Sequence, residues 1–141
     1  MKNRKDLLST AWIFVTLNYL YCDLIGLMDS KLLKQYLTGN VEGFVIDESF
    51  LLYAGILMEL PMAMILLSKI LAKKANCWAN IIAGSIKTTV MIATLFIGNV
   101  TKYYYFFAAI EIITTIFIIG YATQWLRDRE FRTALVKATN L

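Results

Sequence analysis

The amino-acid sequence predicts an all-α protein that forms a four-helix bundle in a membrane. Of its 141 residues, 59% are hydrophobic and 17% are charged, whereas soluble chains have about 45–50% apolar and about 25% charged residues. The apolar residues gather in four stretches of about 20 residues each, the length at which a helix crosses a bilayer. Most charged residues lie between these stretches. We therefore expect a single membrane domain over residues 1–141, with no length left for a separate soluble domain.

The first span is expected at residues 7–28, where an apolar run follows the basic start of the chain. The connection after it, residues 29–48, is polar and contains a short amphipathic piece at residues 30–37, which Gly39 and Gly43 then interrupt. The remaining segments are three further spans at residues 49–71, 76–97 and 103–126, and a charged tail at residues 127–141.

The distribution of basic residues predicts how these spans are oriented. Ten of the fourteen lysines and arginines lie before the first span, after the fourth span, or at the connection between the second and third spans, where Lys69 at the end of the second span is counted with Lys73 and Lys74. Cytoplasmic loops of membrane proteins are enriched in Lys and Arg. We therefore expect a multi-pass protein of the cytoplasmic membrane with both termini in the cytoplasm. The amphipathic piece then belongs to the first extracytoplasmic loop.

The composition argues against several classes of function. The net charge of +4 could suit nucleic acid, but no nucleic-acid-binding motif accompanies it, so no nucleic-acid partner is expected. The chain has no histidine, which is the commonest metal ligand and general base. Its two cysteines, Cys22 and Cys77, form no Cys-x-x-Cys pair. We therefore expect neither a metal site nor a cofactor.

Each predicted span contains one charged residue within its apolar sequence: Asp23, Glu59, Lys87 and Glu111. A charge near the centre of a spanning helix costs about 3 kcal/mol on insertion scales, so such residues usually face a buried polar site. If all four were ionised, they would carry a net charge of −2. Lys87 can compensate one carboxylate, and we expect it to pair with Glu59 or Glu111. The other carboxyls must be hydrated, bind a cation or hold a proton.

Helical spacing adds polar neighbours to these charges. Tyr19 lies one turn before Asp23, Asn18 lies beside that stripe, and Asn80 lies two turns before Lys87. Small and polar residues on these faces permit close packing and hydrogen bonds between membrane helices. No residue stands out as catalytic. The residues expected to bind a ligand or a proton are Asp23, Glu59, Lys87, Glu111, Tyr19, Asn18 and Asn80.

Four segments carry a resemblance to a known family: Leu17–Asp23, Ile56–Met62, Asn76–Gly84 and Phe106–Glu111. Through them the chain resembles a family of small bacterial four-helix integral membrane proteins without an assigned function. The resemblance covers residues 7–126 and implies the fold and a bacterial membrane, but no catalytic residues. In outline the predicted bundle is also similar to the DoxX-like membrane proteins and to the sterol-isomerase and sigma-2 receptor group, and fold does not imply function.

Three functions are compatible with the sequence. The first is binding or transport of a small cationic or amphipathic ligand with proton coupling, in which Asp23, Glu59 and Glu111 act as exchangeable anions. The second is a structural or partner-binding bundle without chemistry, in which a buried Lys–Glu pair fixes the helix register. The third is a membrane enzyme that acts on a lipid or isoprenoid by proton transfer. The partners expected are the lipid bilayer, a small molecule or lipid, and a second copy of the chain.

Overall fold

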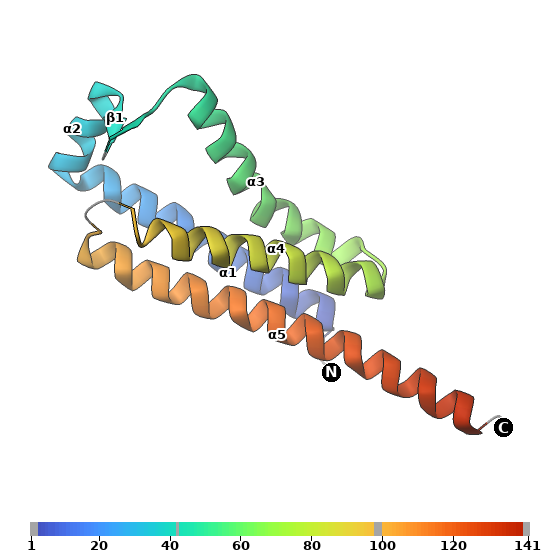
Figure 1. The fold of residues 1–141 in the computed structure, drawn as a ribbon. Coiled ribbons are helices and arrows are strands. Elements are labelled where there is room, and N and C mark those ends of the chain that lie inside the picture. Colours follow the sequence, from blue (N-terminus) through green and yellow to red (C-terminus); the bar gives the residue numbers. More distant parts are fainter. Residues whose placement is uncertain (1–2, 42, 98–99, 140–141) are drawn as a thin grey trace.

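The computed structural model describes residues 3–41, 43–97 and 100–139. These residues form five helices and one short β-hairpin (Figure 1). In chain order the elements are α1 (Arg4–Met28), α2 (Ser30–Thr38), β1 (Asn40–Val41), β2 (Phe44–Val45), α3 (Glu48–Ile70), α4 (Lys73–Thr94) and α5 (Lys102–Thr139). The chain is therefore all-helical, as predicted, apart from this hairpin.

Short polar side chains cap the starts of α1, α2 and α3 by accepting hydrogen bonds from free backbone N–H groups. Asn3 accepts a hydrogen bond from the Lys5 N–H at the start of α1, and Asp47 accepts one from Phe50 at the start of α3. Asp29 separates α1 from α2, and its carboxylate accepts the N–H of Lys31 at 2.9 Å. α2 ends at Gly39 with φ 69°, a left-handed conformation that glycine adopts without a steric penalty.

The long helices lie close to the predicted spans, with two differences. α4 covers residues 73–94 rather than 76–97, because the lysines at its start continue the helix. α5 continues to Thr139 through the segment expected as a separate tail, since no glycine or proline after Gly120 interrupts it.

Within the described residues, three helical segments are long and apolar enough to cross a membrane: Arg4–Met28, Glu48–Ile70 and Lys102–Asp128. α4 has a similar length but a more polar composition, with Asn76, Asn80 and Lys87 all buried. These three polar residues are therefore covered by protein rather than exposed on the surface of the helix.

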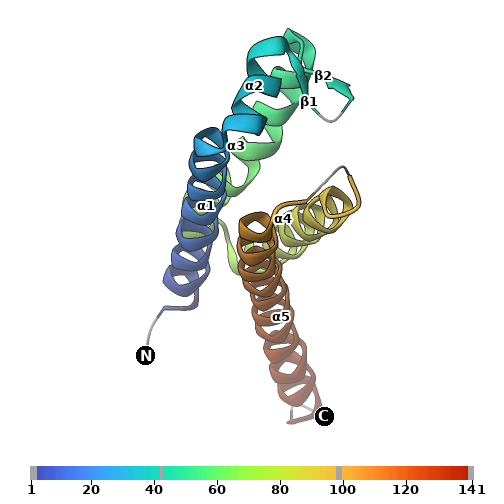
Figure 2. The same cartoon turned by 90° about the vertical axis from the view of Figure 1, so that its left-hand side faces the viewer.

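The long helices pack mainly as the pairs α1–α3 and α4–α5. α1 also packs along α5, whereas α3 meets α4 less extensively. Figure 2 shows the two pairs diverging toward the end that carries α2 and the hairpin. The α4–α5 pair is tight at Gly84, where an added Cβ would lie 2.7 Å from Cγ1 of Ile119. A larger residue at Gly84 would therefore push the two helices apart.

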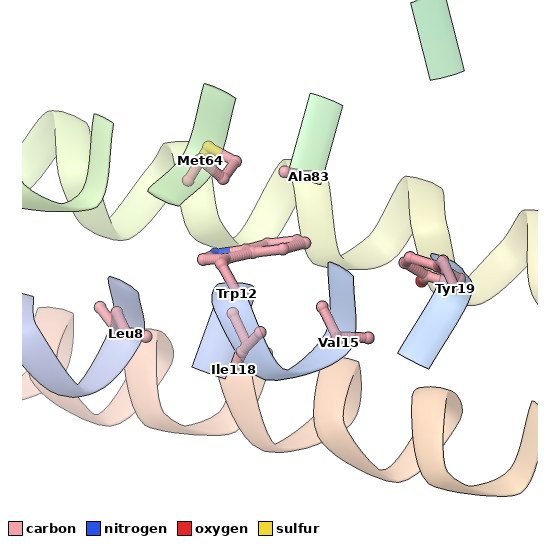
Figure 3. Close-up of a cluster of buried hydrophobic side chains, with 7 residues drawn as sticks. All are labelled: Leu8, Trp12, Val15, Tyr19, Met64, Ala83 and Ile118. Carbon is pink, nitrogen blue, oxygen red and sulfur yellow. The ribbon is translucent and has the colours of Figure 1, made fainter. Parts of the chain in front are cut away.

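The hydrophobic core lies where α1 crosses the other long helices, and Trp12 is at its centre. Figure 3 shows the Trp12 ring between Met64 and Ala83 on one side and Ile118 on the other. Its members are fully or almost fully buried. The core residues are Leu8, Trp12, Val15, Tyr19, Met64, Ala83 and Ile118.

Polar contacts hold the helices together at the end where α1 begins. Arg4 forms an ion pair with Asp128 of α5 at 2.7 Å, and the Lys5 ammonium donates to the carbonyl of Lys69 at the end of α3. The Ser9 hydroxyl, fully buried, donates to the carbonyl of Ile65 at 2.8 Å. The molecule is therefore closed at this end, opposite the end at which the helix pairs diverge (Figure 2).

Candidate functional site

The first buried polar group, which we call the asparagine cluster, consists of Trp12, Ser68, Asn76 and Asn80. All four residues are fully buried. The Trp12 Nε1–H donates to Oδ1 of Asn80 at 2.7 Å, and the Ser68 hydroxyl donates to the same oxygen at 3.3 Å. The Asn80 amide nitrogen donates to the backbone carbonyl and the side-chain oxygen of Asn76, and the Asn76 amide donates to the carbonyl of Ser68.

This cluster joins α1, α3 and α4 through donors and acceptors that satisfy one another. A buried polar network with every member paired rigidifies the packing and offers no open position to a ligand. The sequence predicted that Asn80 belongs to the ligand site. The structure instead places its side chain in the asparagine cluster, with both amide atoms bonded.

The second buried polar group, which we call the Lys87 cluster, consists of Tyr19, Lys87 and Glu111. Lys87 is 4% exposed, and its Nζ lies 3.9 Å from the centroid of the Tyr19 ring. The same ammonium donates to the sulfur of Met58 at 3.7 Å. No ion pair joins Lys87 to a carboxylate among the described residues. Its charge is therefore balanced by an aromatic face and a thioether, which are weak partners.

Glu111 is 1% exposed, and neither of its carboxyl oxygens has a hydrogen-bond partner among the described residues. The hydroxyl of Tyr19 is likewise buried and without a partner within that part of the chain. Lys87 and Tyr19 are in contact, and Glu111 lies close enough for its charge to act on both without forming an ion pair or a hydrogen bond with either. Buried polar groups are normally bonded, so three such atoms in one place are unusual.

The helix that carries Glu111 is fixed to α4 one turn further along. Thr115 donates to the backbone carbonyl of Glu111 at 3.0 Å, and the hydroxyls of Thr88 and Thr115 lie 2.7 Å apart. On the other side of Glu111, the Tyr104 hydroxyl donates to Thr94 at 2.7 Å. These contacts lock the register of α4 against α5, so the orphaned carboxyl of Glu111 is held in a rigid surrounding.

The remaining predicted site residues lie outside the Lys87 cluster. Asp23 is exposed near the C-terminal end of α1, but its charge acts on Lys87. Glu59 is exposed on α3. Asn18 is half-buried and donates to the carbonyl of Phe14 in its own helix at 2.9 Å. The structure therefore brings Tyr19, Lys87 and Glu111 together, with Asp23 at their edge. It does not form the expected ion pair of Lys87 with Glu59 or Glu111.

Several residues that shape these clusters were not predicted from the sequence. Met58 contacts Lys87, but an isolated methionine in an apolar span gives no sequence signal that separates it from ordinary packing residues. Asn76 and Ser68 gave a weaker signal, as isolated polar residues near the ends of apolar segments. Within the described residues, no group of three His, Cys, Asp or Glu side chains comes together as metal ligands.

The fold and its buried charges define an all-helical protein with helices long and apolar enough to cross a membrane. The chain belongs to the DUF6326 family, a family of unknown function, whose profile matches residues 1–132. This membership agrees with the resemblance to a family without an assigned function. Comparisons with curated proteins and with solved structures found no match.

Proposed function

We propose that this chain is an integral membrane protein in which α1, α3, α4 and α5 all cross the bilayer, with both termini in the cytoplasm. The length and composition of α1, α3 and α5 support crossing. Asn76, Asn80 and Lys87 of α4 are buried against its neighbours, which lowers the free-energy cost of a spanning position for that helix. The excess of basic residues at the end where α1 begins and α5 ends supports the orientation.

We further propose that the Lys87 cluster binds a small cationic or amphipathic ligand in exchange for a proton. The observation that carries this proposal is the buried carboxyl of Glu111, whose two oxygens have no hydrogen-bond partner among the described residues. Burying an ionised carboxylate in such surroundings costs several kcal/mol of free energy. The carboxyl group must therefore either hold a proton or bind a cation. The site is thus built to hold one or the other.

The charges around the cluster favour a cation as the competing ligand. Asp23 and Glu111 both act on Lys87, so the three groups carry one net negative charge when ionised. The Tyr19 ring and the Met58 sulfur add apolar and polarisable surface beside the ammonium of Lys87. Aromatic faces also attract organic cations. A ligand with an apolar body and a positive charge therefore matches the chemistry of the site.

Proton coupling can be tested by measuring, at different pH values, how tightly tetraphenylphosphonium, an apolar cation, binds to the protein in phosphatidylcholine vesicles. A cation and a proton compete for the same carboxyl, so lowering the pH should weaken cation binding. We expect the affinity to rise about tenfold or more between about pH 5 and about pH 8. Empty vesicles give the background partitioning of the probe. Saturable binding with no pH dependence, or no saturable binding at all, would contradict the proposal.

We also propose that the protein forms a dimer through α3, because Glu59 is exposed on that helix. A mid-span carboxylate that faces lipid costs about 3 kcal/mol, and a second copy would cover it. The test is disulfide cross-linking in membranes of a variant whose Cys22 and Cys77 are alanine. Ile56→Cys, 61% exposed on α3, should cross-link, whereas the control Ile113→Cys, 68% exposed on α5, should not. Equal cross-linking at both positions would argue against this interface.

A purely structural bundle is the second candidate, and one observation favours it. The contact of Lys87 with the Tyr19 ring and Met58 joins α4 to α1 and α3, so the lysine also contributes to packing. This alternative leaves the unpartnered oxygens of Glu111 without a role.

A further inference from the structure

α2 presents a two-sided surface. At the helical angle of 100° per residue, its apolar side chains occupy one side and its lysines the other. None of its residues is buried. The apolar side consists of Leu32, Leu33, Tyr36 and Leu37, and the polar side consists of Ser30, Lys31, Lys34, Gln35 and Thr38.

The position of α2 is fixed at the end of α1. Asp29 alone separates the two helices, and Figure 1 shows α2 turning away from the direction of α1. At Gly26 an added Cβ would lie 3.3 Å from Cδ2 of Leu32 and 3.6 Å from the hydroxyl of Tyr103. Leu32, at one edge of the apolar side of α2, therefore packs on the end of α1, and Tyr103 of α5 approaches the same glycine.

The environment of Tyr36 agrees with this packing. The pKa of the Tyr36 phenol is raised, mainly by partial burial and to a smaller extent by the nearby charge of Asp23 and by Tyr103. Most of the apolar side is nevertheless open, and Tyr36 itself is 44% exposed. Leu33 is 40% exposed and Leu37 is 80% exposed.

We propose that α2 lies on the surface of the bilayer at which α1 ends, with Leu33 and Leu37 inserted between the lipid chains and Lys31 and Lys34 directed toward lipid phosphates. The inference rests on the proposed membrane position of α1. If α1 crosses the bilayer, its end reaches the interface, and the next helix must begin there. A short amphipathic helix in that position buries its apolar side in the headgroup region.

The charge pattern of α2 favours lipid over a protein partner. Its two lysines lie on the side opposite the leucines, where long side chains can reach phosphates while the apolar side is immersed. In this position α2 anchors the end of the molecule at which the helix pairs diverge (Figure 2).

The test measures how nitroxide labels in phosphatidylcholine vesicles collide with oxygen, which concentrates in lipid, and with a water-soluble nickel chelate. Labels are placed singly at Leu37→Cys, Thr38→Cys and Ile113→Cys in the variant whose Cys22 and Cys77 are alanine. The adjacent Leu37 and Thr38 lie about 100° apart around α2, Leu37 on the apolar side and Thr38 on the polar side, so each is the control for the other. We expect the ratio of oxygen to nickel collisions to be several-fold higher at Leu37 than at Thr38.

Three results would overturn the proposal, and they have different meanings. Equal ratios at Leu37 and Thr38, both dominated by nickel, would place α2 in water. A label at Leu37 that neither reagent reaches would show that protein covers the apolar side. The label at Ile113, 68% exposed on α5, reports on the membrane position itself. If the label at Ile113 collides mainly with oxygen and the label at Leu37 does not, the proposed membrane position is supported and only the inference about α2 fails. If the label at Ile113 collides mainly with nickel, the proposed membrane position fails.

Discussion

Replacing Asn80 with leucine is expected to lower the free energy of unfolding by about 3 kcal/mol, a large loss for a single substitution. Asn80 accepts hydrogen bonds from Trp12 and Ser68 and donates to Asn76, and all four residues are fully buried. Leucine has a similar size but no polar atoms. The substitution therefore leaves three buried polar groups without partners, each at a cost of about 1–3 kcal/mol.

The measurement is denaturant unfolding in detergent micelles, followed by the circular dichroism of the helices. Asn18→Leu is the matched control, because Asn18 is half-buried and bonds only to its own helix. We expect the control to lose less than about 1 kcal/mol. Equal losses for the two variants would show that the asparagine cluster does not clamp α1, α3 and α4.

Replacing Glu111 with glutamine is expected to abolish pH-dependent cation binding while leaving the fold as stable as before or more stable. Glutamine matches the shape of the side chain but cannot take up or release a proton. Because neither carboxyl oxygen has a partner among the described residues, the substitution removes no hydrogen bond formed within them. We expect the free energy of unfolding to change by between zero and about +2 kcal/mol. Cation affinity should fall by about tenfold or more, or about 1.4 kcal/mol.

Glu48→Gln provides the control for this substitution, because it makes the same chemical change at an exposed position in the first turn of α3. Binding by that variant should match the wild type. A Glu111→Gln protein that binds cations normally but unfolds more than about 2 kcal/mol more easily would support the structural alternative instead.

The sequence predicted the helices well because apolar length and helix-capping residues are local signals. The amphipathic piece predicted at residues 30–37 forms α2, which is one residue longer. Its bounds were predictable because Asp29 caps the start of the helix and Gly39 ends it in a left-handed conformation. The hairpin of β1 and β2 was not predicted, because its two-residue strands have no hydrophobic pattern of their own. The orientation of the spans and the similarity to DoxX-like proteins stay predictions.

The site was predictable only in part, because rotation of each helix about its axis depends on packing that one sequence does not reveal. The sequence indicated Tyr19, Lys87 and Glu111 as members of one polar site. The structure places Lys87 against the Tyr19 ring, with the buried Glu111 close enough for its charge to act on both. Asn80 shares a face of α4 with Lys87 but lies two turns away, where Trp12 and Ser68 approach it. Glu59 turned outward because its neighbour Met58 is the α3 residue that contacts Lys87.

The central claim is that Glu111 exchanges a proton for a bound cation. Infrared difference spectroscopy of the reconstituted protein tests this directly, by comparing spectra before and after tetraphenylphosphonium is added. We predict the loss of a protonated-carboxyl C=O band together with the gain of carboxylate bands, both present in the Glu48→Gln protein and absent from the Glu111→Gln protein. Cation binding without any change in carboxyl bands, or with the same change in the Glu111→Gln protein, would contradict the claim.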